Sequence, residues 1–237
     1  MRLCLSFVTL CLSGSPYFIN AFQVLNRQAP QSFVYADSKT SSQAKKSGDD
    51  VVQQYAFPVG TFIEFEEKNR EHIGKIAKLE HKISGGARYL VVDHEGKQYD
   101  IPDKAVRFAM HPPNSPAASD KLFEQFLAAH DATEESIQSK LQISPEILEI
   151  AWEESNETDD HLLTPSALVD LVHSHAASAI EKYMAWKLLR TEMAHIFFKE
   201  IKDHGRVVSF KAKARKAVEA AKETFCNSHN GNDLCLV

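Results

Sequence analysis

Residues 57–110 limit the fold more than any other stretch, because short apolar runs there are each closed by turn-forming residues. Val59, Thr61, Ile63 and Phe65 recur at a period of two, which is typical of a strand with one buried face. Further short strands are predicted at Ile73–Leu79, Arg88–Asp93, Tyr99–Ile101 and Val106–Phe108. A sheet this small hides its edges best by curling on itself, so the segment is predicted to form an SH3-like β-barrel.

Glycine and proline mark the turns of this segment. Ser84-Gly85-Gly86 supplies a turn after the second strand, and Gly96 stands where a hairpin with a bulge requires positive φ. Pro102 ends the next strand, since proline has no N–H to donate to a sheet.

A helical half follows the predicted barrel. Residues 111–118 form a proline-rich linker, and the first helix is predicted to start at Ser119 or Asp120. Ser144 and Thr164 each precede a proline. Each is predicted to cap a helix, because the hydroxyl accepts a backbone N–H and proline at the first helical position needs no such partner.

The fourth helix is predicted from about Ser178 to Ile201 and should be the most buried, because apolar residues lie on two of its faces. The segments FFKEI and RVVSF flank His204-Gly205 and are typical of a small hairpin. Short helices followed by a hairpin indicate a helix-turn-helix core with a β wing, in other words a winged-helix-like domain. Trp152 and Trp186 are predicted to be core residues.

The predicted fold class is therefore α+β, with a small SH3-like β-barrel followed by a helical winged-helix-like domain. The chain is 43% hydrophobic and 25% charged, which is ordinary for a globular protein. The expected organisation is a signal peptide at 1–22, a disordered transit-peptide-like segment at 23–56, the barrel at 57–110, the linker at 111–118, the helical domain at 119–225 and a disordered tail at 226–237.

The N-terminus has the pattern of a targeting leader. The apolar run Leu3–Gly14 follows Arg2 and has the length of a signal-peptide core, too short for a mature membrane span. The Ser-, Gln- and Lys-rich stretch at 23–48 holds one acid, Asp37, as in an organellar transit peptide. The Ala21-Phe22 junction between them resembles the bipartite plastid leader of diatoms and related algae. We therefore expect import into the chloroplast stroma, with secretion as the alternative.

The net charge of −5 excludes a uniformly basic nucleic-acid binder, so any contact with RNA must come from a local patch. In the predicted barrel, Glu64, Glu66 and Glu67 are expected to form an acidic rim. The residues predicted to form a basic rim that contacts RNA phosphates are Lys75, Lys78, Lys82 and Arg88. A solvated surface of mixed charge is the alternative interpretation of this rim.

The segment KAKARKAVEAAKETF, residues 211–225, is predicted to form a basic amphipathic helix. Lys211, Arg215 and Lys222 lie on roughly one face of that helix, and an apolar face lies opposite. These three residues are the second candidate contact with an RNA backbone, because cations on one side concentrate positive potential. A solvated helix face is again the alternative.

The sequence contains no motif for catalysis or metal binding, since a glycine-rich phosphate loop, HExxH and a paired CxxC are all missing. The four cysteines lie outside residues 57–225, which gives no disulfide framework. His173 and His175 come closest to a metal pair, but two residues apart on a helix their rings would point to different sides. No catalytic residue, metal site, cofactor or small-molecule substrate is predicted for this chain.

The predicted barrel and the helical half together resemble the N-terminal region of organellar and cyanobacterial ribonuclease II family proteins, and the strongest match is in the helices. In that family a proline-led helix with a Leu-Glu-x-Ala-Trp core precedes a Thr-Pro-led helix and then a helix carrying Tyr-x-Ala-x-x-Leu-Leu. The matching residues here are Leu148, Glu149, Ala151, Trp152, Thr164, Pro165, Tyr183, Ala185, Leu188 and Leu189. The resemblance covers roughly residues 59–200, and its motifs are informative in combination.

The family consists of processive 3′-to-5′ RNA exonucleases whose catalytic domain binds Mg²⁺ through clustered aspartates, as two-metal hydrolysis requires. The resemblance implies that this chain is an accessory RNA-binding region that serves RNA processing or decay in the plastid, with single-stranded RNA as its partner. The chain ends before such a catalytic domain could begin, so we expect a fragment truncated ahead of it. Mg²⁺ is expected only in that missing domain.

Two other functions fit the sequence. The barrel or the helical domain could dock a protein partner without any role in RNA binding, because SH3-like folds serve many partners. A complete small enzyme of unknown chemistry is the third hypothesis, which the lack of converging polar residues disfavours.

Overall fold

The computed structural model describes residues 56–82, 86–157, 160–203 and 205–228. The predicted leader up to residue 55 and the tail from residue 229 lie outside these ranges, as does most of the Ser84-Gly85-Gly86 turn. None of the helices within the described ranges combines the length and the apolar character that crossing a bilayer requires.

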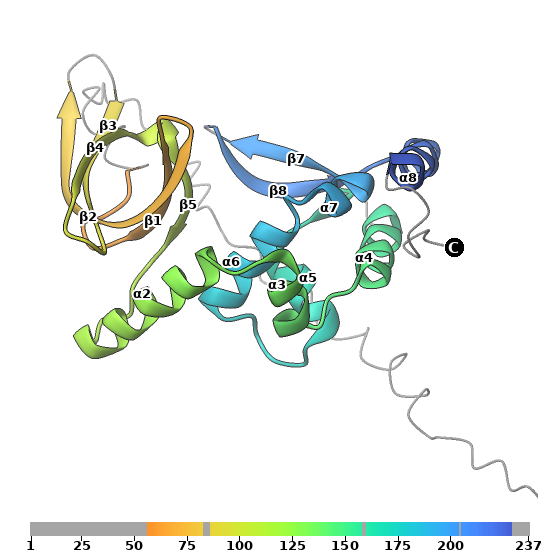
Figure 1. The fold of residues 1–237 in the computed structure, drawn as a ribbon, viewed down its shortest axis with the longest axis horizontal. Helices are drawn as coiled ribbons and strands as arrows, with labels where there is room; N and C mark the ends of the chain where they lie inside the picture. Colours follow the sequence, from red (N-terminus) through yellow and green to blue (C-terminus); the bar gives the residue numbers. More distant parts are fainter. Residues whose placement is uncertain (1–55, 83–85, 158–159, 204, 229–237) are drawn as a thin grey trace, which may run out of the picture. The chain divides into compact units, whose positions relative to one another are not determined.

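The first part of the described chain is a curved antiparallel sheet of five strands in the order β4-β3-β2-β1-β5 (Figure 1). The last strand returns to pair with the first, so the sheet has the connectivity of an SH3-like barrel, and the predicted fold is confirmed. Its elements are β1 (Phe62–Glu67), β2 (Arg70–Lys82), β3 (Gly86–Asp93), β4 (Gln98–Pro102), a 3₁₀ turn η2 (Asp103–Ala105) and β5 (Val106–Met110).

Alternation along the strands builds the barrel core. Ile63 and Phe65 of β1 are fully buried inside the barrel, as the period of two predicts. A register shift between Ile76 and Lys78 bends the long β2, which lets one strand take part in both halves of the curved sheet. Gly96 has a φ of +83°, in agreement with the predicted turn. The other buried members are Ile76, Ala87, Tyr89, Val91, Tyr99, Ile101 and Val106.

The second face of β1 differs from the prediction. The alternation predicts Val59 on the buried face, but Val59 precedes the strand and is 61% exposed. Phe62 and Glu64, on the face opposite Ile63, are 1% exposed each. The helical part of the chain covers this face, so β1 is buried on both sides. A period of two predicts only one buried face. It cannot reveal a second one when a segment far away in the chain packs against it.

The helical part has the topology of a winged helix domain, as predicted. A two-residue strand lies beside a hairpin in the sheet order β6-β8-β7 (Figure 1). The elements are α2 (Pro116–His130), α3 (Glu134–Leu141), α4 (Pro145–Glu157), β6 (Leu162–Leu163), α5 (Pro165–Val172), α6 (Ala179–Leu188), α7 (Glu192–Phe197), β7 (Phe198–Asp203), β8 (Arg206–Ala212) and α8 (Arg215–Ser228).

Hydroxyl caps set the starts of several helices. α4 and α5 begin at Pro145 and Pro165, which confirms the two predicted starts, and the Thr164 hydroxyl accepts the N–H of Ala167 at 3.2 Å. α6 begins with a capping box, in which the Ser178 hydroxyl and the Glu181 carboxylate each accept the other residue's backbone N–H.

Three helix predictions require correction. α2 starts at Pro116 instead of Ser119 or Asp120, because Pro116 is suited to the first helical position. α3 was not predicted at all, since its two buried side chains give too short a pattern. The long helix expected over 178–201 is α6, α7 and β7, because the Thr191 hydroxyl caps a new helix at the Ala194 N–H.

One apolar core runs through both parts of the chain. Phe62, Ile73 and Met110 of the barrel belong to the same buried cluster as the helices, and the rings of Phe62 and Phe123 lie 5.0 Å apart. Trp152 and Trp186 are 4% and 2% exposed, which confirms both as core residues. Five of the ten residues of α6 are buried, in agreement with the expectation for the fourth helix.

We predict that Gly74→Ala destabilises the barrel by about 1–3 kcal/mol, because its added methyl group overpacks the core. A Cβ at this position would lie 2.4 Å from Val91 Cγ1 and 2.8 Å from the carbonyl oxygen of Val92. Urea unfolding measures the loss. Gly96→Asn is the control, because a Cβ there meets no atom within 4 Å and asparagine tolerates positive φ. An equal effect of both substitutions would contradict the prediction.

Candidate nucleic-acid interface

The wing sheet carries two exposed lysines side by side. Lys199 of β7 and Lys211 of β8 are direct partners in the antiparallel register, and both are exposed. Within the described part of the chain, neither ammonium group has an ion-pair partner. Like charges directly opposite each other in a sheet are destabilising. An anion that binds between the two ammonium groups would therefore reduce the repulsion between them.

More cations follow Lys211 along the chain. The Lys213 ammonium donates to the carbonyl oxygen of His195, and the Trp152 indole Nε1 donates to the carbonyl oxygen of Lys213 at 2.7 Å. Arg215 and Lys216 begin α8 and are exposed. We call Lys199, Lys211, Lys213, Arg215 and Lys216 the wing patch.

The structure separates the three cations that were predicted to share one helix face. Lys211 lies in β8 and not in the helix, which corrects the prediction of a helix over 211–225. The Arg215 guanidinium lies 5.7 Å from the centre of the Trp152 ring. Lys222 forms an ion pair with Glu149 at 2.7 Å, so it attaches α8 to α4.

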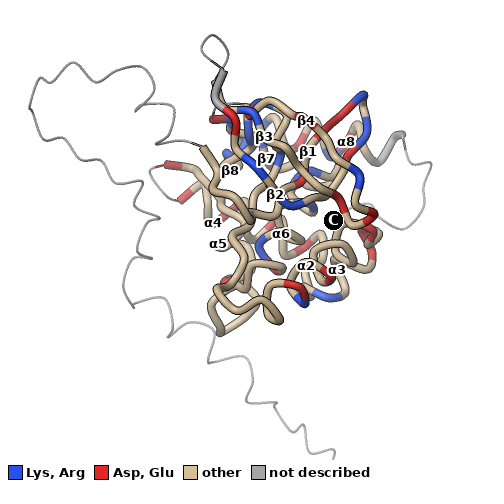
Figure 2. Tube along the Cα trace, turned by 90° about the vertical axis from the view of Figure 1, so that its left-hand side faces the viewer, with Lys and Arg blue, Asp and Glu red and all other residues tan. Residues whose placement is uncertain are grey.

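The cations of the predicted barrel rim lie on the neighbouring strands β2 and β3, and two of the four form ion pairs. Lys78 contacts Glu80 at 3.0 Å, and Arg88 contacts Asp100 at 2.8 Å. The Asp100 carboxylate raises the pKa of Arg88 by accepting its hydrogen bond. Lys75 is exposed on β2, and Lys82 ends that strand. Figure 2 shows segments of both charges in the region of the barrel strands, and the two ion pairs favour the mixed-charge alternative for this rim.

Sequence reasoning missed Lys199. The residue lies in FFKEI, which was assigned both to the end of the long helix and to the predicted hairpin, and its pairing with Lys211 was not recognised. The signal that could have found it is the alternation in FKEIK, where Phe198 is buried, Lys199 is exposed and Glu200 is again partly buried.

The longer helix between α5 and the wing is covered by other parts of the chain. Helix-turn-helix proteins read DNA through a helix at this place in the topology, where this chain has α6 and α7, and α6 is the longer of the two. None of its ten residues is exposed. The rings of Tyr183 and Trp186 contact Phe108 of β5, at 5.0 and 5.2 Å, and the Lys187 ammonium donates to carbonyl oxygens at the end of α2. Burial lowers the pKa of Lys187. α6 therefore holds the barrel and cannot enter a major groove in this conformation.

A buried polar cluster joins the barrel to the helices. Glu64 was predicted to be part of an acidic rim, but it is 1% exposed and accepts a hydrogen bond from the Tyr183 hydroxyl. His130 Nδ1 lies 3.1 Å from the same hydroxyl and 3.4 Å from Glu64. Burial and the charge of Glu64 raise the pKa of Tyr183, so the phenol stays protonated. A buried carboxylate needs such partners, which explains why these side chains meet.

Arg190 supplies the positive charge of this cluster. Its guanidinium lies 4.3 Å from the centre of the Trp186 ring. It also faces carboxylates of three strands, Glu64 at 3.8 Å, Glu71 at 4.0 Å and Glu200 at 3.4 Å. Burial alone would raise the pKa of Glu200, but Lys202 and Arg190 outweigh it and lower the pKa.

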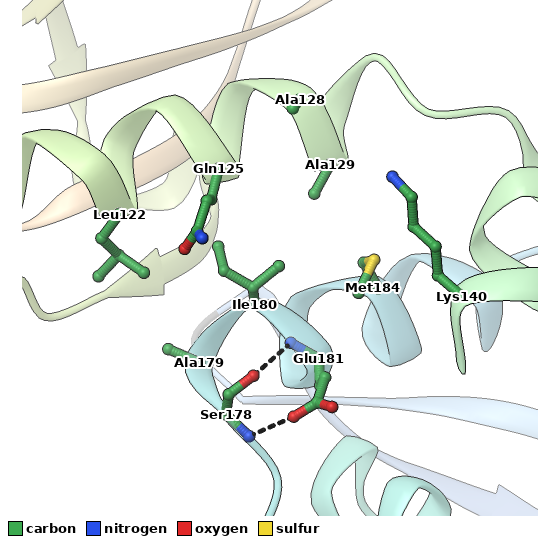
Figure 3. Close-up of a pocket in the computed structure, with 10 residues that line it drawn as sticks. All are labelled: Leu122, Gln125, Ala128, Ala129, Lys140, Ser178, Ala179, Ile180, Glu181 and Met184. Carbon is green, nitrogen blue, oxygen red and sulfur yellow. Dashed lines mark hydrogen bonds between the residues drawn. The ribbon is translucent and has the colours of Figure 1, made fainter. Parts of the chain in front are cut away.

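An apolar groove lies between α2 and α6, with a volume of about 480 Å³. Figure 3 shows Leu122, Ile180 and Met184 facing this groove, with Lys140 at the end next to Met184. The groove is open to small apolar groups, and it holds no converging set of catalytic side chains.

The histidine pair also differs from the prediction. His173 and His175 follow α5 instead of lying on it, and their rings are 5.1 Å apart instead of pointing to different sides. His173 Nε2 lies 3.0 Å from the carbonyl oxygen of Leu141, and His175 Nε2 lies 3.0 Å from Glu181. Within the described ranges, no three His, Cys, Asp or Glu residues gather to hold a metal ion.

The topology and the site define a winged helix domain that shares its core with an SH3-like barrel. Residues 134–217 match the family "Ribonuclease II, winged helix domain". The chain thus contains a ribonuclease II winged helix domain, and the resemblance to the N-terminal region of ribonuclease II proteins is confirmed.

Other comparisons add little. A solved structure of an active-site mutant of the Dss1 exoribonuclease from Candida glabrata has a TM-score of 0.48 and 9% sequence identity. The match covers 78% of this chain and 27% of that one. The likeness is weak, and the assignment rests on the family match. No curated protein matches the chain.

We predict that Tyr183→Phe lowers the free energy of unfolding by about 1–3 kcal/mol, because Glu64 stays buried after losing its donor. The control is Tyr99→Phe, whose hydroxyl donates to Asp93 at 3.0 Å. Asp93 keeps two backbone N–H donors, from Glu95 and Lys97, so the control should cost about 1 kcal/mol or less. Urea unfolding compares the two. A smaller loss for Tyr183→Phe would contradict the structural role of the cluster.

The capping box of α6 should weaken in acid. Partial burial raises the pKa of Glu181, but the hydrogen bonds from Ser178 and the neighbouring His175 outweigh it and lower the pKa to about 2 from the usual 4.5. A lowered pKa stabilises the fold above the usual value, and this stability is lost as the pH falls toward 2. Compared with Glu181→Gln, the natural protein should be more stable by up to about 1 kcal/mol at neutral pH. The urea midpoints of the natural protein and of Glu181→Gln should converge as the pH falls. A difference that stays constant with pH would contradict the prediction.

Proposed function

We propose that this chain is the accessory RNA-binding region of a ribonuclease II-type 3′-to-5′ exoribonuclease. The wing patch holds the phosphate backbone of single-stranded RNA, and the barrel keeps the wing in place. In this proposal, hydrolysis with its Mg²⁺ is assigned to the catalytic domain of such an enzyme. The chain would thus hold RNA without cleaving it.

The observation that carries this proposal is the pair Lys199 and Lys211. Two exposed ammonium groups face the same side of the wing sheet without an acid beside them, although the whole chain has a net charge of −5. Two cations of the barrel rim, Lys78 and Arg88, have carboxylate partners instead. Phosphates of a flexible single strand can settle between the two lysines, and released counterions favour the binding.

Because α6 is covered by the barrel and α2, single-stranded RNA is favoured over duplex DNA as the partner. A helix-turn-helix protein reads a duplex by inserting this helix into the major groove, and α6 has no exposed residue to insert. Contact through the wing needs only an accessible backbone.

We further propose that the protein acts on RNA in the plastid stroma. This part rests on the leader pattern with its Ala21-Phe22 junction, which lies outside the described residues. Expression of residues 1–55 fused to a fluorescent protein in an alga with such plastids tests it, and accumulation in the medium would support secretion instead.

Salt-dependent RNA binding tests the proposal. The full chain should bind a single-stranded RNA oligomer, followed by fluorescence anisotropy, with an affinity that falls steeply between about 50 and 200 mM salt. The double variant Lys199→Gln/Lys211→Gln should lower the slope of log affinity against log salt by about 1.4, which is two phosphate contacts at about 0.7 each. It should also be no less stable in urea, since the like charges repel.

The matched control is Lys78→Gln/Arg88→Gln, which removes the same charge from the barrel rim. It should leave the slope unchanged. Equal losses in both variants would mean that only net charge matters. Salt-independent binding, or no binding at low salt, would contradict the RNA role, and Mg²⁺-dependent cleavage by the purified chain would contradict its accessory character.

A protein-interaction role is the second candidate, and the groove between α2 and α6 favours it. Its walls are mostly apolar, with Leu122, Ile180 and Met184 facing a volume of about 480 Å³. Ile180 is only partly buried, so Ile180→Glu would place a charge in the groove and should abolish capture of a partner that survives RNase treatment. RNA binding by the wing patch would be unaffected.

A further inference from the structure

A second, polar pocket lies where the end of α4 meets the start of α8. It has a volume of about 390 Å³ and is lined by Trp152, Glu153, Asn156, Glu157 and Arg215. Its position next to the wing patch is fixed by the hydrogen bond from the Trp152 indole to the carbonyl oxygen of Lys213, at 2.7 Å. RNA that follows the lysines of the wing would therefore pass this pocket.

The flat surface of the pocket is the Arg215 guanidinium. The group lies 5.7 Å from the centre of the Trp152 ring, so it contacts the indole on one side. The arginine itself is exposed, so it remains accessible to solvent. Asn156 is also fixed, because its amide nitrogen donates to the carbonyl oxygen of Trp152 at 2.9 Å. Unpaired RNA bases stack on planar guanidinium groups of this kind.

Acceptors are supplied by two glutamates. Glu153 and Glu157 lie one turn apart on α4, both are exposed, and both line the pocket. Among the described residues, neither carboxylate forms an ion pair, and neither does Arg215. The pocket therefore presents a flat cation and two carboxylates with a space between them. A planar group that donates hydrogen bonds fits this space, whereas a phosphate would be repelled by the glutamates.

We propose that this pocket binds one unstacked RNA base that carries an exocyclic amino group. The base lies on Arg215 and donates its amino N–H to Glu153 or Glu157, while its phosphates lie toward the lysines of the wing patch. Cytosine fits, because its N4 amino group donates to carboxylates. Uracil does not, because it presents a carbonyl oxygen at that position. The inference rests on the proposed function and adds base selectivity to it.

Two oligomers test the proposal on the full chain at slightly alkaline pH, a single-stranded oligocytidylate and an oligouridylate of equal length. The natural protein should bind oligocytidylate about fivefold to tenfold more tightly, which is the lower range of discrimination for one good base contact. Glu153→Gln/Glu157→Gln should bring this ratio close to one, because an amide donates to uracil as readily as it accepts from cytosine. Arg215→Lys keeps the charge but loses the plane, so it should also reduce the ratio.

The matched control is Glu154→Gln/Glu219→Gln, which removes the same amount of charge from α4 and α8, the two helices that form the pocket, at positions that do not line it. It should keep the ratio of the natural protein. Equal binding of both oligomers by the natural protein, or a ratio that survives in Glu153→Gln/Glu157→Gln, overturns the base site and leaves the proposed function standing. Absence of binding to either oligomer at low salt overturns the proposed function and this site with it.

Discussion

The buried contact between Glu64 and Tyr183 is the interaction on which the arrangement of this protein depends. A carboxylate that is 1% exposed is costly to bury unless donors surround it, and the barrel offers it none. The donors come from the helical domain, with the Tyr183 hydroxyl and the nearby His130 and Arg190. Because a buried charge tolerates few geometries, this contact fixes the barrel against α6, while the shared apolar core supplies the burial energy.

That attachment decides which surface is left for a partner. α6 is the helix that a winged helix domain commonly offers to nucleic acid, and here it is used to hold the barrel. The wing and the start of α8 remain exposed, and on the wing Lys199 and Lys211 lie side by side without an ion-pair partner among the described residues. An acidic protein can thus present a locally positive surface, while several of its carboxylates are gathered around Arg190.

The candidate site was only partly accessible to sequence reasoning. Lys211 was selected because it starts a run of basic residues, and its exposure on β8 keeps it in the proposed interface. Lys199, its neighbour in space, was hidden in a stretch that has helical as well as strand character. Lys222 was placed on a basic helix face, although its ion pair with Glu149 attaches the helix to the domain. Which lysine has an acid beside it depends on contacts between segments far apart in the chain.

The sequence by itself determined the local elements and the class of the fold. Period-two alternation with turn glycines specified the barrel, and hydroxyl-proline pairs at Ser144 and Thr164 specified two helix starts, because these signals act over a few residues. Only the tertiary structure decided that Glu64 is buried, that the stretch after Leu188 breaks into α7 and β7, and that Lys199 meets Lys211. Each of these depends on the burial or pairing of one segment against another, and no local pattern in the sequence reports such contacts.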